Sequence, residues 1–360
     1  MKKIKIAMLS KNLELNGITN VILNYCNNLD LQKFSLTLYV SNPLNNKVVE
    51  EIKNRGIDIV ELPQKRKSVF KYYLQLFKML HTKKYDIIHV HGNSTIMMIE
   101  LLIAKLSKIR VRIAHCHNSK CSNKIFNFLL KLPLNLLSTE CLACSEAAGK
   151  WVFWKKFIVL PNAFDINKFK YNQKYRDNLR KKYDISNEIV IGHTGRFNNQ
   201  KNQEFIIEFV KKLVDKNYNV KCIFVGDGPN FKNVKDSLKD SEYLRNFIFA
   251  GESSEVYKFY NMMDMFIFPS KFEGLGISIL EAQLNGLNCM ASLSVPKITN
   301  ITGNAHYLSL DNIDEWLNFF DNNKELCLRN NIDFESDSIQ FYNITKTVKM
   351  LEEIYNKYTR

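Results

Sequence analysis

Two glutamates eight positions apart, Glu273 and Glu281, are the residues whose spacing most suggests chemistry. They bracket a turn with Gly274 and Gly276, which follows the apolar run 265–268 and precedes a helical pattern. A helix start exposes unpaired backbone N–H groups and the positive end of the helix dipole, and both favour phosphate. Carboxylates accept hydrogen bonds from sugar hydroxyls. The segment therefore predicts a site for a ligand that carries both groups, such as a sugar nucleotide.

Two cations form the second set of candidates. An apolar strand pattern ends at Gly195, Arg196 follows it, and Lys201 comes five residues later. Arginine can hold phosphate oxygens through two N–H groups, whereas lysine acts as a point charge. A departing nucleoside diphosphate gains negative charge, which fixed cations stabilise. An arginine and a lysine at this spacing are more often solvated surface residues, so their functional interpretation depends on the two glutamates downstream.

The elements that must position these residues alternate along the chain. Short apolar runs alternate with longer segments of helical period in both halves, which is typical of βα units and parallel sheets. The 360 residues exceed the size that one core usually supports, so we expect two domains with a boundary near 161–175. Ligands bind at the carboxyl ends of the strands in such sheets. Gly226 and Gly251 follow two further predicted strands of the second half.

The ordered motifs resemble the retaining family 4 glycosyltransferases, also described as glycosyl transferases group 1. The stretch from Pro269 to Ala282 reads Pro-Ser-x-Phe-Glu-Gly-x-Gly-x-x-x-Leu-Glu-Ala, which is similar to the E-x7-E motif of that family. The resemblance covers most of the chain and implies an α/β protein of the GT-B fold, with two Rossmann-like domains whose parallel sheets face each other across a cleft. It implies an acceptor domain over 1–165, a donor domain over 175–343, and a C-terminal helix, 344–360, that packs back onto the first domain.

The resemblance also implies roles for single residues. Glu281 would contact the ribose, Glu273 would lie near the donor sugar and its phosphates, and Arg196 with Lys201 would hold the diphosphate. His117, beside Asn118 and Ser119, resembles the histidine near the donor sugar, and His115 on the same strand face is its rival. The expected catalytic residues are thus Glu273 and His117, and the expected donor-binding residues are Gly17, Arg196, Lys201, Gly226, Gly251, Gly274, Leu275, Gly276 and Glu281.

The implied reaction is transfer of a hexose from a UDP-linked donor, with retention, to a saccharide on a polyprenyl diphosphate carrier in exopolysaccharide or capsule synthesis. No cofactor and no metal are expected, because the two cations supply the necessary charge. Two alternatives stay open: a non-catalytic, membrane-associated partner of an active glycosyltransferase, and a nucleotide-sugar epimerase of the same fold. Asn288 replaces a usual proline, and Leu293 and Ile298 replace acids that such relatives carry, changes that can alter donor choice or reduce activity.

Positive charge is concentrated in residues 62–139, which hold 14 Lys and Arg against two acids and so account for +12 of the net +15. Within this basic region, 65–84 combines basic residues with apolar positions at helical spacing, and 124–137 is apolar on most sides and carries Lys124 and Lys131. Such helices are typical of membrane-surface binding, although their apolar faces can instead pack on a sheet. We expect a cytoplasmic protein that binds the anionic inner face of the cell membrane through residues 62–139. No nucleic-acid recognition module is recognisable, and the eight cysteines are expected to be reduced.

Overall fold

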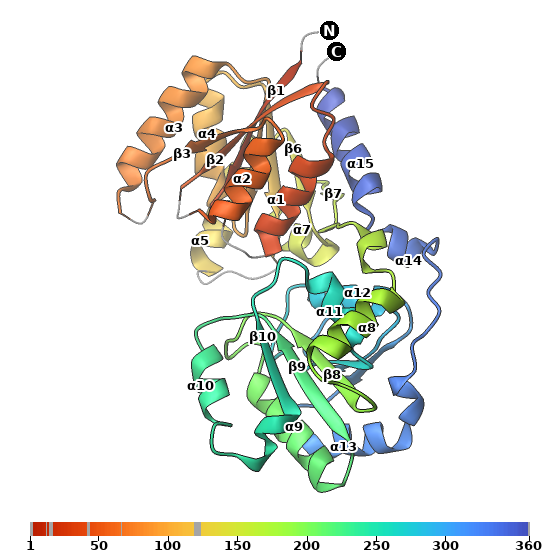
Figure 1. Cartoon of the computed structure of the whole chain (residues 1–360). Coiled ribbons are helices and arrows are strands. Elements are labelled where there is room, and N and C mark those ends of the chain that lie inside the picture. The colour runs from red at the N-terminus through yellow and green to blue at the C-terminus, as the bar shows by residue number, and fades with distance from the viewer. Residues whose placement is uncertain are drawn as a thin grey trace. The chain divides into compact units, whose positions relative to one another are not determined.

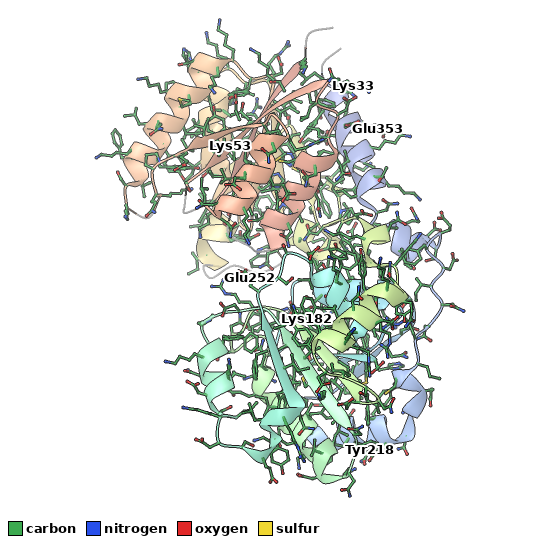
Figure 2. All side chains as sticks on the ribbon, viewed as in Figure 1. Lys33, Lys53, Lys182, Tyr218, Glu252 and Glu353 are labelled. Carbon is green, nitrogen blue, oxygen red and sulfur yellow. The ribbon has the colours of Figure 1, made fainter. Side chains whose placement is uncertain are left out.

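The computed structural model describes residues 3–11, 13, 17–41, 44–65, 67–118 and 124–358. The chain divides into two compact units: unit 1 contains Met1–Asp165 and Phe341–Arg360, and unit 2 contains Ile166–Gln340 (Figure 1). Unit 2 therefore includes residues 166–174, which the sequence prediction left between its two domains. Charged side chains such as Lys53, Lys182 and Glu353 are exposed (Figure 2). Within the described ranges, no helix is long and apolar enough to span a membrane.

Among the described residues of unit 1, seven strands form a parallel sheet in the order β3-β2-β1-β4-β5-β6-β7. Their core positions are almost continuously apolar, because helices cover both faces of the sheet. The strands are β1 (Ile4–Ser10), β2 (Phe34–Val40), β3 (Asp58–Glu61), β4 (Ile87–Gly92), β5 (Val111–Cys116), β6 (Glu140–Ala143) and β7 (Ile158–Val159).

The helices of unit 1 form two layers. Buried side chains of α1, α2 and α15 join one apolar cluster, and those of α3, α4, α6 and α7 join the other. The C-terminal helix α15 contacts α1. The helices are α1 (Gly17–Asn28), α2 (Asn46–Asn54), α3 (Val69–Lys83), α4 (Met97–Leu106), α5 (Lys124–Leu129), α6 (Lys131–Leu137), α7 (Glu146–Val152) and α15 (Ile344–Asn356).

The segment 124–137 was expected as one amphipathic helix, and this expectation was wrong. It forms two helices, α5 and α6, separated at Leu130. Pro133 provides the physical reason, because proline has no N–H to donate to the carbonyl of residue 129 and its ring clashes with that carbonyl. The earlier basic segment does form a single helix, α3, whose first turn is capped when the Ser68 side chain accepts from the Lys71 N–H.

Unit 2 contains a six-stranded parallel sheet among its described residues, in the order β10-β9-β8-β11-β12-β13. Its strands are β8 (Ile189–Thr194), β9 (Val220–Val225), β10 (Phe247–Gly251), β11 (Met265–Phe268), β12 (Asn288–Ser292) and β13 (Ala305–Leu308). Its helices are α8 (Gln173–Lys182), α9 (Gln203–Asp215), α10 (Phe231–Asp236), α11 (Val256–Met262), α12 (Ile277–Leu284), α13 (Ile313–Asn322) and α14 (Asp337–Gln340). Short 3-10 turns are η1 (Ile166–Phe169), η2 (Glu242–Asn246), η3 (Lys297–Thr299) and η4 (Lys324–Cys327).

Each sheet has one point where the strand order reverses, between β1 and β4 in unit 1 and between β8 and β11 in unit 2. The loops that leave two such neighbouring strands run to opposite sides of the sheet, so a crevice opens at their carboxyl ends. These two positions are where the fold favours a ligand site.

Candidate functional site

In unit 2, the carboxyl ends of β8, β9 and β10 approach one another closely through glycines. The Gly226 N–H donates to the Gly251 carbonyl at 2.8 Å, and the Gly195 N–H donates to the Val225 carbonyl at 3.0 Å. A Cβ atom at Gly226, where φ is +141°, would lie 2.1 Å from the carbonyl oxygen of Gly195. Only glycine therefore fits at this position. Gly226 and Gly251 thus shape the sheet edge next to Arg196.

Two of the predicted residues form an ion pair. Lys201 Nζ lies 2.6 Å from Glu273 Oε1, and the side chains of Lys201 and Glu273 are only 15% and 7% exposed. The ammonium group also lies over the Phe268 ring, 4.4 Å from its centre. The Lys201 N–H donates to Asn198 Oδ1 at 3.0 Å, which shapes the loop that carries the lysine. The cation after β8 and the carboxylate after β11 thus belong to one site.

The loops that carry Lys201 and Glu273 are tied to each other by hydrogen bonds. The Gln200 side chain donates to the Phe272 carbonyl at 2.9 Å, and the Lys271 N–H donates to the Gln200 carbonyl at 2.8 Å. The Asn202 side chain donates to the Pro269 carbonyl at 3.3 Å. These bonds hold the two loops in a fixed register.

Arg196, the other predicted cation, is exposed. Its backbone carbonyl accepts from the Gln203 side chain at 3.2 Å, whereas no ion pair or hydrogen bond of its guanidinium group occurs within the described ranges. A Cβ atom at Gly228 would lie 3.0 Å from Arg196 Cγ and 2.4 Å from the Phe197 carbonyl oxygen, so Gly228 makes room for this loop. The guanidinium group is therefore available for an anion.

The start of α12 lies in the same region. Gly276 precedes the helix with φ +82°, a left-handed conformation that favours glycine. A Cβ atom there would lie 3.0 Å from the Phe268 ring and 3.7 Å from Glu273 Cγ. Gly274 is exposed and Leu275 is partly buried in the turn between Glu273 and this helix start. The first N–H groups of α12 thus begin close to the Lys201–Glu273 pair.

Glu281 lies one turn into α12 and is held by a tyrosine that sequence reasoning missed. The Tyr260 hydroxyl is 2.7 Å from Glu281 Oε2 and 2.7 Å from Thr194 Oγ1. Burial raises the pKa of Glu281, whereas the Tyr260 bond and the charges of Lys168 and Lys201 oppose that rise. Neither Tyr260 nor Thr194 belongs to a recognisable motif, because a tyrosine among apolar residues of a helix resembles core.

In unit 1, four histidines form a stack: His89 and His91 of β4, His115 of β5, and the predicted His117, which directly follows β5. His91 is paired with His115 in the strand register, and the rings of neighbouring members lie 4.2–5.3 Å apart. Tyr25 of α1 packs against the stack. Burial lowers the pKa of His117 to about 4 and those of the other three well below the ordinary value of 6.5. The stack is therefore neutral at pH 7.

Hydrogen bonds fix the tautomer of His117. Its Nδ1 lies 3.0 Å from Asn162 Oδ1, which can only accept, so Nδ1 carries the proton. The neutral ring then accepts through Nε2, which lies 2.8 Å from Nδ1 of His91. Both ring nitrogens of His117 are thus engaged within unit 1, and a substrate hydroxyl would have to displace one partner to reach them.

The ring nitrogens of His89, His91 and His115 lie within 4.8 Å of one another, a spacing that could suit a metal ion. The ring planes of His89 and His115 differ by only 12°, and those of His89 and His91 by 26°. His89 Nε2 and His115 Nδ1 lie 3.2 Å apart and share a hydrogen bond, so one of these two nitrogens carries a proton and has no lone pair for a metal ion. This geometry favours a neutral stack, and the expectation of a metal-free reaction stays a prediction.

The remaining predicted positions are placed as follows. Gly17 is the first residue of α1, while Asn16 and Ser119 lie outside the described residues. The Asn288 side chain donates to the carbonyls of Leu326 and Leu328 at 3.1 Å each, from the amino end of β12 and thus from the sheet edge opposite the site loops. Leu293 and Ile298 are exposed beyond the carboxyl end of β12.

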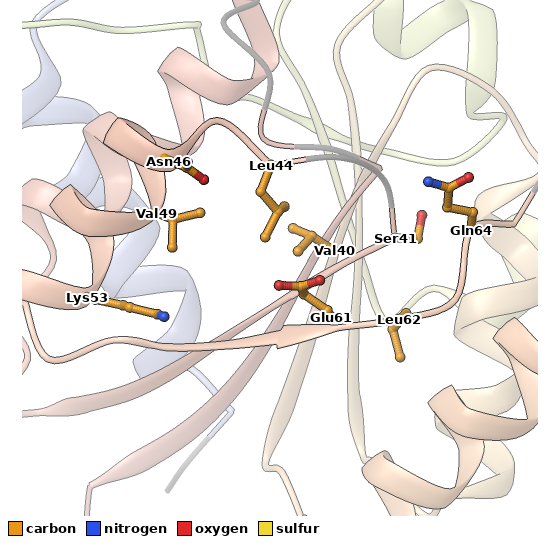
Figure 3. A pocket seen from close by; sticks show the side chains of 9 residues that line it. All are labelled: Val40, Ser41, Leu44, Asn46, Val49, Lys53, Glu61, Leu62 and Gln64. Carbon is orange, nitrogen blue, oxygen red and sulfur yellow. The ribbon is translucent and has the colours of Figure 1, made fainter.

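A separate cavity of about 470 Å³ lies in unit 1 at the carboxyl ends of β2 and β3 (Figure 3). None of the predicted donor-binding residues lines it. Its lining side chains are Val40, Ser41, Leu44, Asn46, Val49, Lys53, Glu61, Leu62 and Gln64.

The basic region presents an exposed apolar surface on the outer side of its helices. In α3, Tyr72, Leu76 and Leu80 are buried, whereas Phe70 and Leu74 are 76% and 55% exposed. Helix α4 contacts both α3 and α6, so the three helices are neighbours. We define the outer surface of unit 1 as the exposed apolar residues Phe70, Leu74, Leu102, Leu106, Leu132 and Leu136.

Comparison with known proteins identifies related sequences and structures. A family model described as "Glycosyl transferases group 1" matches residues 175–311, and one described as "Glycosyl transferase 4-like" matches residues 5–145. The UDP-Gal:α-D-GlcNAc-diphosphoundecaprenol α-1,3-galactosyltransferase of Escherichia coli is 25% identical over 386 residues, covering 98% of this chain and 97% of that protein. The capsular polysaccharide biosynthesis glycosyltransferase CapH of Staphylococcus aureus is 25% identical over 350 residues, covering 90% and 91%.

Among solved structures, HepE of Anabaena in complex with UDP-glucose superposes with a TM-score of 0.79 and 16% identity, covering 98% of this chain and 99% of HepE. At this identity the likeness shows the fold alone. The two family models together match most of both units, each on one side of the division between them.

Proposed function

We propose a function from the premise that the chain belongs to the group 1 glycosyltransferases of family 4 and has the GT-B fold. In this proposal the protein transfers a hexose, with retention, from a UDP-sugar to a polyprenyl-diphosphate-linked saccharide in exopolysaccharide or capsule synthesis. One observation carries the proposal. Arg196, Lys201, Glu273 and Glu281 follow β8 and β11, the two strands at which the sheet order of unit 2 reverses. Fixed cations, a helix start and two carboxylates there suit a nucleotide diphosphate with sugars at both ends.

The diphosphate binds between cations that differ in their freedom. Arg196 has no ion-pair partner among the described residues and can hold phosphate oxygens through two N–H groups. Lys201 is already oriented by Glu273 at 2.6 Å, so its charge is fixed before the donor arrives. As the bond between the anomeric carbon and the phosphate oxygen breaks, UDP gains negative charge that both cations stabilise.

The sugars at the two ends of the diphosphate interact with the two carboxylates. Glu281 accepts hydrogen bonds from the ribose hydroxyls, and Glu273 accepts them from the transferred hexose. The acceptor hydroxyl forms its new bond to the anomeric carbon on the face that UDP leaves, and its proton goes to an oxygen of the departing phosphate. This step uses no protein nucleophile and no metal ion, so turnover is expected to persist in EDTA.

Unit 2 is the donor unit and unit 1 the acceptor unit in this proposal. The carboxyl ends of β4 and β5 carry His117 toward the acceptor side, and the relative from Escherichia coli is named for an acceptor on diphosphoundecaprenol. His117 acts through the shape of its ring rather than as a proton acceptor, because Asn162 and His91 occupy both of its nitrogens.

The outer surface of unit 1 brings the enzyme to the cytoplasmic face of an anionic membrane, where such an acceptor lies. Exposed lysines lie in or directly beside helices α3 and α4, which carry four of its apolar residues: Lys67, Lys71, Lys78, Lys105 and Lys108. Each lysine near an anionic bilayer contributes about 1 kcal/mol. Lys65 does not contribute, because it pairs with Glu100 at 2.6 Å. We expect co-sedimentation with phosphatidylglycerol vesicles, weaker binding by Phe70→Ser, and no binding to phosphatidylcholine; equal binding to both lipids would contradict this role.

The test of the whole proposal is turnover. The protein is incubated in EDTA with UDP-glucose, UDP-galactose or UDP-GlcNAc and with undecaprenyl-diphosphate-linked GlcNAc, and the lipid product is analysed by mass spectrometry and NMR. We expect one donor to give a product whose new linkage keeps the α configuration, and Arg196→Ala to abolish it. Interconversion of UDP-sugars without transfer would identify an epimerase. Absence of any turnover, with vesicle binding intact, would identify a non-catalytic partner.

A further inference from the structure

A buried chain of three side chains links the end of β8 to the carboxylate of Glu281. Tyr260 is fully buried in α11, and its hydroxyl lies 2.7 Å from both Thr194 Oγ1 and Glu281 Oε2. An ionised carboxylate can only accept, so the tyrosine hydroxyl donates to Glu281. Its oxygen then accepts from the hydroxyl of Thr194. The direction of both bonds is therefore set by the charge of Glu281.

The tyrosine ring cannot move away from this position without repacking its surroundings. It packs against Phe169 and Phe266, with ring centres 6.0 and 5.8 Å away. Thr194 is the last residue of β8 and directly precedes Gly195 and Arg196. The same strand end thus carries the arginine expected at the diphosphate and the threonine that begins the chain to Glu281.

The bond from Tyr260 leaves one carboxylate oxygen without a partner. Glu281 Oε2 accepts from Tyr260, whereas no hydrogen bond to Oε1 occurs within the described ranges. The charged and titratable groups that act on this carboxyl are Tyr260 from α11, Lys168 from η1 and Lys201 from the loop before α9. Of these, only Tyr260 contacts it directly.

We propose that Tyr260 and Thr194 are positioning residues for nucleotide recognition, which keep Glu281 ionised and leave its Oε1 for the ribose hydroxyls. This inference rests on the proposed function, since it takes the ribose of a UDP-sugar as the ligand. Without the tyrosine hydroxyl, the carboxylate would lose a hydrogen bond that favours its charged form, and the protonated form would replace one ribose acceptor by a donor.

The experiment compares two ligands, UDP and 2′,3′-dideoxy-UDP, by isothermal titration calorimetry between pH 6 and pH 9. The variants are Tyr260→Phe, Thr194→Val and Glu281→Gln. Tyr257→Phe is the matched control, because Tyr257 lies on the same helix but its hydroxyl bonds to the exposed Glu255. The readout is the ratio of the affinity for UDP to the affinity for dideoxy-UDP at each pH. Both ligands carry the same diphosphate, so protonation of the diphosphate affects both affinities alike and leaves the ratio unchanged.

We expect the wild type and Tyr257→Phe to prefer UDP, and Glu281→Gln to lose that preference. Tyr260→Phe should bind UDP about tenfold more weakly at pH 7, bind dideoxy-UDP unchanged, and regain the preference as the pH rises and Glu281 ionises. Thr194→Val should change the ratio in the same direction but less, and it carries the test if Tyr260→Phe does not fold.

If Tyr260→Phe weakens the binding of both ligands equally, or of neither, the inference is overturned. UDP binding by the wild type would still support the proposed function. A wild type that binds UDP and dideoxy-UDP equally would remove the role of the ribose and the inference with it. A wild type that binds neither would overturn the proposed function as well.

Discussion

Lowering the pH from 7.5 to 5.5 is expected to destabilise unit 1 through its stacked histidines. Burial holds the pKa of His117 at about 4 and those of His89, His91 and His115 well below 6.5, the value expected in the unfolded chain. Between these values the unfolded chain takes up protons that the folded unit does not. The free energy of unfolding therefore falls as the pH falls, and the stability is fully present only above pH 6.5.

The size of the effect follows from the shifts. A histidine that ionises at 6.5 when unfolded and stays neutral in the folded unit contributes a loss of about 1.4 kcal/mol between pH 7.5 and 5.5. Four such residues together amount to about 5.5 kcal/mol, which is a large part of the roughly 5–15 kcal/mol that stabilises a domain.

The assay is urea unfolding at both pH values in a Trp316→Phe background, so that fluorescence reports only Trp151 and Trp154 of unit 1. His89→Gln should reduce the pH-dependent loss by about 1.4 kcal/mol. His81→Gln is the control, because the exposed His81 should leave the loss unchanged. Stability equal at the two pH values, or higher at pH 5.5, would refute the reasoning that burial keeps the stack neutral.

Three other perturbations test the site. Lys201→Ala should weaken UDP binding about tenfold to hundredfold by calorimetry, because a hydrogen bond to a charged group contributes about 1.5–3 kcal/mol. Lys216→Ala is the control, because it removes an ion pair with Asp321 that is remote from the site loops and should leave UDP binding unchanged. Equal weakening of UDP binding by both variants would contradict the role of Lys201. Gly226→Ala should destabilise the fold by about 2 kcal/mol more than Gly56→Ala in urea unfolding, since both have positive φ but only Gly226 meets backbone within 4 Å. Nitrogen NMR should find the proton of the neutral His117 ring on Nδ1 in the wild type, and a mixture of the Nδ1-H and Nε2-H tautomers in Asn162→Ala. A wild-type ring that carries its proton on Nε2 would contradict the hydrogen bond from Nδ1 to Asn162.

Much of the fold could be anticipated from the sequence, because alternating apolar runs and helical periods require parallel sheets covered by helices. The α/β class and the GT-B fold are confirmed by the strand order and by the likeness to HepE. The break before Pro133 follows from a local rule, since proline at that position interrupts a helix whatever the apolar pattern around it.

The site was only partly predictable. The residues after β8 and β11 could be expected to meet, because carboxyl ends of parallel strands share one sheet edge, and Lys201 and Glu273 do meet there. The role of Tyr260 could not be expected, because its contact with Glu281 depends on how α11 packs beside β8. The histidine stack likewise depends on the β4–β5 register, which no local pattern specifies.

The most direct test of the central claim is hydrogen–deuterium exchange of the whole protein with and without UDP in EDTA, read by mass spectrometry. We expect protection in the segments 194–203 and 269–281, which carry Arg196, Lys201, Glu273 and Glu281, and loss of that protection in Arg196→Ala. Protection confined to residues 40–64, around the cavity at the ends of β2 and β3, or no protection at all, would contradict the claim that unit 2 binds the donor nucleotide.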